Sequence, residues 1–276
     1  MATSKTITPA TGRRVTLASL RKAKGEGRRF AALTAYDASF AALEDAAGIE
    51  VILVGDSLGM VVQGHRSTIP VTMEHVVYHT ALVTRGAGSA LVMGDMPFMS
   101  FATVDEARHN AARLMQEGGA EIVKLEGTGA QAETVEALSA QGIPVCAHLG
   151  LRPQAVHKVG AYKIQGREPE AAQALMEDAA VLEQAGADIL LLECVPATLA
   201  KKITEQAQVP VIGIGAGVHC DGQILVLYDM LGITPGRRPS FSKDFLIDSG
   251  GIFAALQNYA EAVRSGTFPG PEHAFE

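Results

Sequence analysis

The sequence has no tryptophan, and aromatic residues make up only 5% of its 276 positions. Its hydrophobic content of 47% therefore rests on valine, isoleucine, leucine, alanine and methionine. Such residues suit parallel strands that helices cover on both faces. The length allows one large domain or two small ones. Because proline and glycine are spread evenly and no low-complexity linker occurs, we expect a single domain over residues 1–276.

Cysteines and long apolar runs are also scarce. The cysteines Cys146, Cys194 and Cys220 are widely spaced and form no Cys-x-x-Cys motif, which favours a reducing compartment over a disulfide framework. No uncharged apolar run is long enough to span a bilayer, and no basic stretch followed by an apolar segment opens the chain. We therefore expect a cytoplasmic protein without a membrane partner.

Positive charge is lacking overall, because the formal net charge is -7. This charge argues against a general nucleic-acid or anionic-membrane binder. The first thirty residues are the exception, with eight lysines and arginines against the single acid Glu26. A transit peptide is one interpretation. We favour a solvated first helix, TLASLRKAKGEGRRF (16–30), that runs directly into a strand.

One sequence phrase recurs along the chain. In each copy the end of a helix is followed by a glycine, an acidic residue and a run of strand formers. The glycine stands where a helix C-cap needs a left-handed residue. The copies are EDAAGIEVILVGD (44–56), QEGGAEIVKLEG (116–127), EQAGADILLLECV (183–195) and a weaker GAGSALVMGDMP (86–97).

Further apolar runs and helical segments fill the spaces between these copies. The runs are FAALTAY (30–36), IPVCAHLG (143–150), VPVIGIGAG (209–217) and QILVLYDML (223–231), and helical spacing marks 104–117, 131–141, 170–185 and 197–207. About eight strands that alternate with helices predict a (β/α)₈ TIM barrel. We expect a long loop over 150–169, no full helix between the last two strands, and extra helices at both ends of the chain. A doubly wound open sheet remains the alternative, because sequence does not reveal closure.

Ionisable groups fall at the ends of five consecutive predicted strands, where a barrel places its active site. A single strand-end carboxylate is best explained as a cap of the next helix, but five are not. Buried acids in this number need a counter-charge beyond one lysine, and a divalent cation would supply it. The residues are Asp56 with Ser57, Asp95, Lys124 with Glu126 two positions later, His148 and Glu193.

Asp56 and Asp95 are the best candidate metal ligands. Hard oxygen donors without clustered histidine or cysteine indicate Mg²⁺ rather than Zn²⁺. Mg²⁺ is held by one or two carboxylates and keeps positions for water and substrate. Glu126 is a third ligand or the holder of a metal-bound water. An ion pair between Glu126 and Lys124 has nearly equal weight.

Two other classes of function remain open at this point. GDSLG (55–59) matches the G-x-S-x-G nucleophile elbow and resembles a lipase and esterase signature, with Ser57 as nucleophile. The esterase family normally has a late Asp-x-x-His, and no aspartate here is followed by histidine at that spacing. A thiol nucleophile at Cys146 is less favoured than a small buried hydrophobe. The second class is a non-catalytic binding protein with a regulatory metal.

Several motifs, in this order along the chain, resemble the ketopantoate hydroxymethyltransferase family. They are VGDSLGMVVQGH (54–65), MPFM (96–99), VKLEG (123–127), HLGLRPQ (148–154), YKIQGR (162–167), LECVP (192–196) and IGIGAGVHCDGQILV (212–226). The resemblance covers nearly the whole chain. It departs from the family at Arg66, where an acid is common, and at Val218-His219, in loops beside the site.

The resemblance implies a barrel of the phosphoenolpyruvate/pyruvate-binding type, related to the phosphoenolpyruvate mutase and isocitrate lyase group. It implies transfer of a one-carbon unit from 5,10-methylenetetrahydrofolate to 3-methyl-2-oxobutanoate, giving 2-dehydropantoate for pantothenate synthesis. It also implies a homo-oligomer, a dimer-based ring that is often a decamer. The implied site has Glu193 as proton acceptor, Asp56, Asp95 and Glu126 at Mg²⁺, and Asp56, Ser57, Asp95 and Lys124 at the keto acid.

Overall fold

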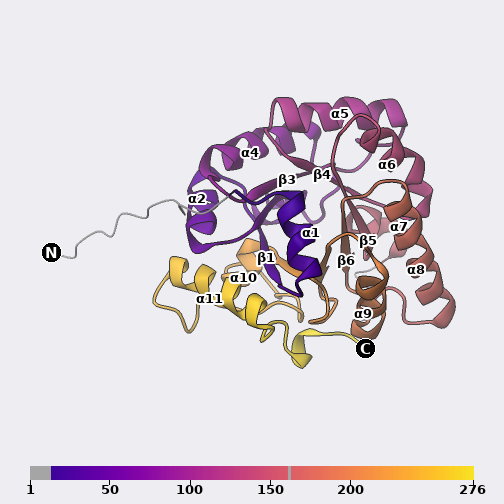
Figure 1. Ribbon diagram of the computed structural model, residues 1–276. Helices are drawn as coiled ribbons and strands as arrows, with labels where there is room; N and C mark the ends of the chain where they lie inside the picture. Colours follow the sequence, from indigo (N-terminus) through magenta and orange to yellow (C-terminus); the bar gives the residue numbers. More distant parts are fainter. Residues whose placement is uncertain (1–13, 161–162) are drawn as a thin grey trace.

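Eight parallel strands close into a barrel in the order of the chain, and the first strand pairs with the last. The computed structural model describes residues 14–160 and 163–276 (Figure 1). The predicted (β/α)₈ barrel is confirmed. The alternative of an open sheet is wrong, because the first and last strands pair with each other and leave no unpaired edge. The strands are β1 (Phe30–Thr34), β2 (Val51–Val54), β3 (Leu91–Asp95), β4 (Ile122–Glu126), β5 (Val145–Gly150), β6 (Ile189–Glu193), β7 (Val211–Ile214) and β8 (Gly222–Leu225).

The long helices form the outer layer around the strands (Figure 1). The four predicted helical segments are confirmed to within two residues at each end. The long helices are α2 (Ala38–Ala47), α4 (Met73–Gly86), α5 (Val104–Gln116), α6 (Ala132–Ser139), α8 (Pro169–Gln184), α9 (Ala197–Gln206) and α11 (Ile252–Ser265). The short ones are α3 (Leu58–Val61), α7 (Val156–Val159), α10 (Leu227–Met230), and the 3₁₀ turns η1 (Gly129–Gln131), η2 (Pro153–Ala155) and η3 (Pro271–His273).

The recurring glycines end helices as predicted. Gly48 is the C-cap of α2 with φ +87°, and Gly119 and Gly186 have φ +76° and +105°. Each glycine turns the chain from an outer helix back toward the barrel, because this left-handed conformation costs glycine little. The strand that follows each glycine is buried, except for Glu193 at the end of β6, which is partly buried.

Two segments differ from their predictions. The eighth strand ends at Leu225 rather than continuing to 231, because α10 begins at Leu227, whose amide donates to Thr34 Oγ1 at 2.9 Å. The loop over 150–169 is not fully irregular, since it contains η2 and α7. The C-terminal segment has one long helix, α11, followed by the turn η3.

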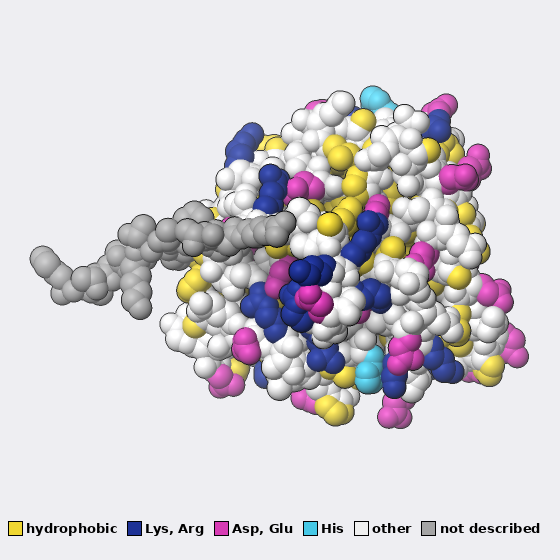
Figure 2. All heavy atoms as spheres, in the orientation of Figure 1, with side chains coloured by type: hydrophobic (Ala, Val, Ile, Leu, Met, Phe, Trp, Pro, Cys, Tyr) yellow, Lys and Arg dark blue, Asp and Glu magenta, His cyan; other side chains and the backbone are white. Residues whose placement is uncertain are grey.

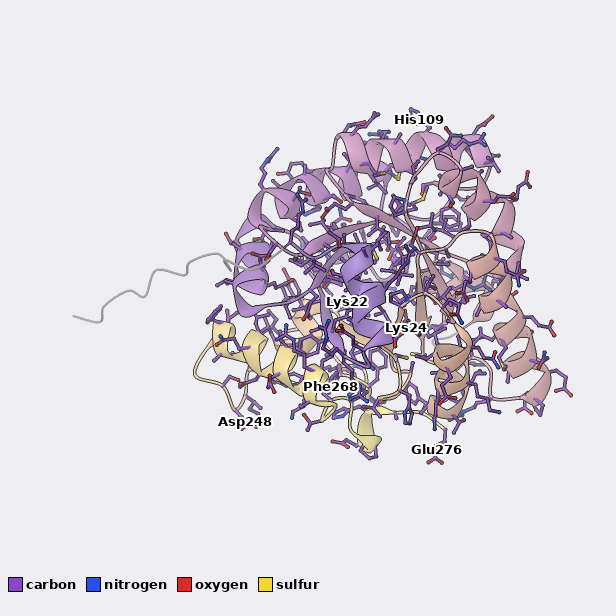
Figure 3. All side chains as sticks on the ribbon, in the orientation of Figure 1. Lys22, Lys24, His109, Asp248, Phe268 and Glu276 are labelled. Carbon is purple, nitrogen blue, oxygen red and sulfur yellow. The ribbon has the colours of Figure 1, made fainter. Side chains whose placement is uncertain are left out.

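The first helix, α1 (Leu17–Gly25), covers the N-terminal end of the barrel. Lys24 Nζ lies 2.8 Å from Asp221 Oδ2, and Arg21 contacts Asp188; these acids precede β8 and β6. Figure 2 shows basic side chains gathered on this face, and Figure 3 places Lys22 and Lys24 on the helix. The predicted solvated helix is confirmed from residue 14 onward. The rest of the basic segment, residues 1–13, lies outside the described residues.

The described helices include none with both the length and the apolar character to cross a bilayer.

Candidate active site

The C-terminal ends of strands β2 to β6 bring the predicted polar residues into one cluster. The strand register sets Asp95 beside Lys124 and Glu126 beside His148. Alternation along each strand then turns these side chains to the same side of the sheet. Each is at most 5% exposed, as is Asp56. The sequence placed these groups in one region, and the structure confirms that they are neighbours.

Lys124 is the cation of this cluster, and its closest acid is Asp95. Its Nζ lies 2.7 Å from Asp95 Oδ1. Burial by itself lowers the pKa of Lys124, but the charges of Asp95, Glu126 and Asp56 outweigh burial and raise the pKa above its ordinary value. Lys124 is therefore a permanent ammonium. The alternative ion pair with Glu126 does not form, because Lys124 turns to Asp95 instead.

Asp56 and Asp95 lie against each other. The backbone amide of Asp56 donates to Asp95 Oδ2 at 3.0 Å. Burial and the nearby charge of Asp95 raise the pKa of Asp56 to about 7, although Lys124 opposes the shift. Two carboxylates in one buried place repel each other, and a cation between them relieves that repulsion.

Gln154, from the turn η2, joins two of the acids. Its side-chain Nε2 donates to Asp56 Oδ2 at 2.9 Å and to the carbonyl of Met96 at 3.0 Å. Its backbone amide donates to Glu126 Oε2 at 3.1 Å. Sequence reasoning gave Gln154 no role, although it is the last residue of the HLGLRPQ motif (148–154). The available signals were that motif and its position in the loop after a strand that carries site residues.

The donor set fits Mg²⁺ held by two carboxylates. Among residues 14–160 and 163–276, no three His, Cys, Asp or Glu side chains converge closely enough to hold a metal alone. Mg²⁺ does not need such a cage, because water and substrate complete its octahedron. Asp56 and Asp95 supply two hard oxygen donors, and Glu126 Oε1 is a buried oxygen without a hydrogen-bond partner. Glu126 is therefore placed to accept from a water.

Glu193 and His148 meet at the next position around the barrel. His148 Nε2 lies 3.2 Å from Glu193 Oε2, and His148 Nδ1 lies 3.4 Å from Lys124 Nζ. Burial and the charge of Lys124 hold the pKa of His148 well below its usual range, so the imidazole is neutral. A neutral ring that accepts from an ammonium at Nδ1 carries its proton on Nε2. Nε2 lies against the Glu193 carboxylate, but no hydrogen bond forms between them.

Glu193 is the least buried of the acids, with a side chain 14% exposed. Burial raises the pKa of Glu193 to about 8; Lys124 opposes this shift and Asp95 adds to it. A carboxyl group with this pKa is mostly protonated at pH 7, and its deprotonated form is a stronger base than an ordinary glutamate carboxylate.

Ser57 has a phenol rather than an imidazole as its partner. Ser57 Oγ lies 2.8 Å from the hydroxyl of Tyr36, and burial raises the pKa of Tyr36 above its ordinary value. A protonated phenol cannot activate a serine as a histidine does, and the one histidine that lines the cavity, His148, contacts Lys124 and Glu193 instead. Burial also raises the pKa of Cys146 to about 12, which leaves this thiol unreactive.

The cluster forms the floor of a cavity of about 1030 Å³. Strand residues such as Asp56, Asp95, Lys124 and Glu193 line its inner part. Loop residues 163–168 and 234–241, together with Phe275, line the rest. Arg66 and Val218-His219, where the sequence departs from the family pattern, do not line it.

A family model described as ketopantoate hydroxymethyltransferase matches residues 14–271. The chain belongs to the ketopantoate hydroxymethyltransferase family. It is 61% identical to the 3-methyl-2-oxobutanoate hydroxymethyltransferase of Alkalilimnicola ehrlichii, over 97% of this chain and 96% of that protein. It is 57% identical to the protein of the same name from Halorhodospira halophila, over 97% of each. As a member of this family the chain is an enzyme, a hydroxymethyltransferase.

Solved structures with the same fold are more distant in sequence. A phosphonopyruvate hydrolase superposes with a TM-score of 0.60 at 15% identity, covering 79% of this chain and 83% of that chain. A 2,3-dimethylmalate lyase, a member of the PEP mutase/isocitrate lyase superfamily, has a TM-score of 0.57 at 14% identity, covering 80% and 81%. These neighbours confirm the predicted relationship at the level of fold.

Proposed function

We propose that the enzyme transfers a hydroxymethyl group from 5,10-methylenetetrahydrofolate to 3-methyl-2-oxobutanoate, giving 2-dehydropantoate for pantothenate synthesis. Family membership supports the activity class. The observation that carries the proposal is the placement of a weakly acidic glutamate, Glu193, in the same cavity as the paired acids Asp56 and Asp95. Such a site can bind a 2-oxo acid and remove the hydrogen on its C3.

Asp56 and Asp95 would hold Mg²⁺ in this proposal. Mg²⁺ supplies Lewis acidity, which polarises the ketone of a 2-oxo acid and makes the hydrogen on C3 more acidic. Gln154 keeps the Asp56 carboxylate in place through the hydrogen bond to Oδ2. Glu126 would accept from a water beside the metal, because its Oε1 is buried and unpartnered.

Lys124 and Ser57 would bind the substrate carboxylate. Lys124 remains charged at every working pH because the surrounding acids raise its pKa. Ser57 follows β2 directly and its hydroxyl is oriented by Tyr36. Both side chains line the cavity beside Asp56 and Asp95. The ammonium and the hydroxyl therefore fix the acid end of the substrate while its C3 remains free to react.

Glu193 would take the proton from C3. The neutral imidazole of His148 packs against Glu193, with Nε2 3.2 Å from Oε2, and would so limit the orientations of the carboxylate. The substrate carbanion that results is an enolate. Its carbon would form a C–C bond with the methylene carbon of the folate while the two C–N bonds of that methylene break. Water would supply the hydroxyl oxygen, and the proton taken by Glu193 and one proton of the water would end on the two folate nitrogens. The cavity of about 1030 Å³ is much larger than a five-carbon acid needs, which leaves room for this second substrate.

Exchange of the C3 hydrogen of 3-methyl-2-oxobutanoate in deuterated water tests substrate, metal and base together. We expect exchange with Mg²⁺ and its loss on chelation. Glu193→Gln should still bind the keto acid but stop exchange. Asp56→Ala should weaken the binding of both Mg²⁺ and keto acid, and Ser57→Ala should keep substantial activity. Continued exchange in Glu193→Gln would show that Glu193 is not the base.

The homo-oligomeric, dimer-based ring stays a prediction.

A further inference from the structure

Two aromatic side chains form a wall in the outer, loop-lined part of the cavity. Phe241 and Phe275 meet edge to face, with ring centroids 6.3 Å apart and an interplanar angle of 81°. Both line the cavity. The proposed proton transfer uses neither ring, so the wall needs another explanation.

The end of β7 is shaped to receive this wall. Gly215 has φ +59°, and a Cβ there would lie 3.1 Å from a ring atom of Phe241 and 3.1 Å from one of Phe275. A side chain at residue 215 would therefore push both rings away, and the left-handed backbone favours glycine in any case. The backbone passes close behind the rings and fixes their position.

The segment that carries Phe275 is anchored at two points. The carbonyl of Phe275 accepts from the amide of Ala197, the first residue of α9, at 2.8 Å. Arg167 Nε donates to the carbonyl of Glu276 at 2.9 Å. Figure 3 shows Glu276 at the C-terminal end of the chain, and Figure 1 shows that end beside α9. Phe275 is thus held over the cavity by bonds to two other segments.

Basic side chains surround the same outer part. Lys163 and Arg167 come from the loop after β5, and Arg237 comes from the loop after α10. All three are exposed, and Glu168 is the one acid among the described lining residues of these two loops. Asp229 of α10 is a further acid of the cavity lining, so these three cations outnumber the two acids by one, in a protein whose formal charge is -7.

We propose that this outer part binds the folate through a flat ring system against Phe241 and Phe275, and that Lys163 and Arg237 select carriers with several tail carboxylates. The inference rests on the proposed function, which requires a folate in this cavity. Aromatic rings stabilise a stacked or edge-on partner ring, and lysine and arginine at a cavity mouth attract successive carboxylates. The enzyme therefore prefers polyglutamylated to monoglutamylated tetrahydrofolate.

Direct binding measurements test the preference without any turnover. Tetrahydrofolate with one and with three γ-linked glutamates would be titrated calorimetrically into the wild type. Two exposed cations give a preference of about fivefold for the longer tail, and it should fade with added salt. The double variant Lys163→Gln/Arg237→Gln should reduce the ratio to about one. This variant keeps Arg167, which anchors Glu276, so the aromatic wall remains in place.

Three further variants separate the tail from the ring. Lys22→Gln/Arg28→Gln removes the same charge at the opposite end of the barrel and should keep the preference. Glu168→Gln should increase the preference for the longer tail. Phe241→Leu should weaken the binding of both folates by a similar factor, about fivefold.

Equal affinity of the wild type for the two tails would overturn the proposal, as would a preference that survives Lys163→Gln/Arg237→Gln. Absence of C3 hydrogen exchange in the wild type is a separate result. It would overturn the proposed function, while the binding data would still decide this inference.

Discussion

His148 Nε2 lies 3.2 Å from Glu193 Oε2, while Nδ1 of the same ring lies 3.4 Å from Lys124 Nζ. The ring therefore connects the cation of the site to its proposed base. Because burial and Lys124 hold the pKa of His148 far below its usual range, the ring contributes an N–H and no charge. We expect it to act on the reaction by positioning Glu193.

Replacing His148 should change the rate of proton transfer more than substrate binding. His148→Phe keeps the ring volume but removes the N–H, and we expect kcat for C3 exchange to fall by roughly tenfold to a hundredfold, as for other lost orienting groups. The KM for the keto acid should change little. His148→Gln, which can donate a hydrogen bond, should recover part of the rate. An equal rise in KM with unchanged kcat would assign His148 to substrate binding instead.

The buried ion pair between Lys124 and Asp95 predicts a compensating pair of variants. Lys124→Met should lower the free energy of unfolding by about 3–5 kcal/mol, because it leaves buried acids without their cation. Lys124→Met/Asp95→Asn removes both charges and should regain much of that loss in a denaturant titration. Neither variant should bind the keto acid well. If Lys124→Met were as stable as the wild type, the pair would not be buried in solution.

The raised pKa of Glu193 makes stability depend on pH. The folded pKa of about 8 lies above the ordinary value of 4.5, so between these values the folded state binds more protons than the unfolded state. This contribution is fully present below pH 4.5, and it is lost as pH rises toward 8. Glu193→Gln cannot ionise, so its stability relative to the wild type should increase with pH.

Thermal melting from pH 5 to pH 9 measures this difference. We expect Glu193→Gln to gain on the order of 2 kcal/mol relative to the wild type by pH 9, or roughly 4 °C in Tm. The rate of C3 exchange by the wild type should rise over the same upper pH range, because the base must be deprotonated. A Tm difference that stays constant with pH would show that Glu193 has an ordinary pKa.

Gly150 ties the end of β5 to the residue that carries the base. It has φ +90°, and a Cβ there would lie 2.3 Å from the carbonyl oxygen of Glu193. Gly150→Ala must therefore displace the end of β6, and we expect a loss of about 2–4 kcal/mol in stability together with slower exchange. Gly142→Ala is the matched control, because Gly142 has φ +77° with no atom near its Cβ. It should cost only about 1 kcal/mol and leave exchange unchanged.

The sequence by itself determined the alternation of strands and helices and the location of the site, whereas closure of the sheet into a barrel is seen only in the structure. Apolar runs of strand length separated by helical spacing, with a glycine at the end of each helix, leave few ways to bury the strands. Ionisable residues at the end of strand after strand could then meet only at one rim. For this reason Asp56, Asp95, Lys124, Glu126, His148 and Glu193 were identifiable before any coordinates.

Only the tertiary structure decided which of these groups are partners. Alternation within β4 places Lys124 on the same face of the strand as Glu126. Lys124 nevertheless pairs with Asp95 on the neighbouring strand, because the register between β3 and β4 brings these two residues side by side. Gln154 and Tyr36 reach the site from a loop and from the end of β1, and no local spacing marks them. Sequence periodicity fixes which face a side chain occupies, whereas hydrogen bonds and pKa values depend on distances between segments far apart in the chain.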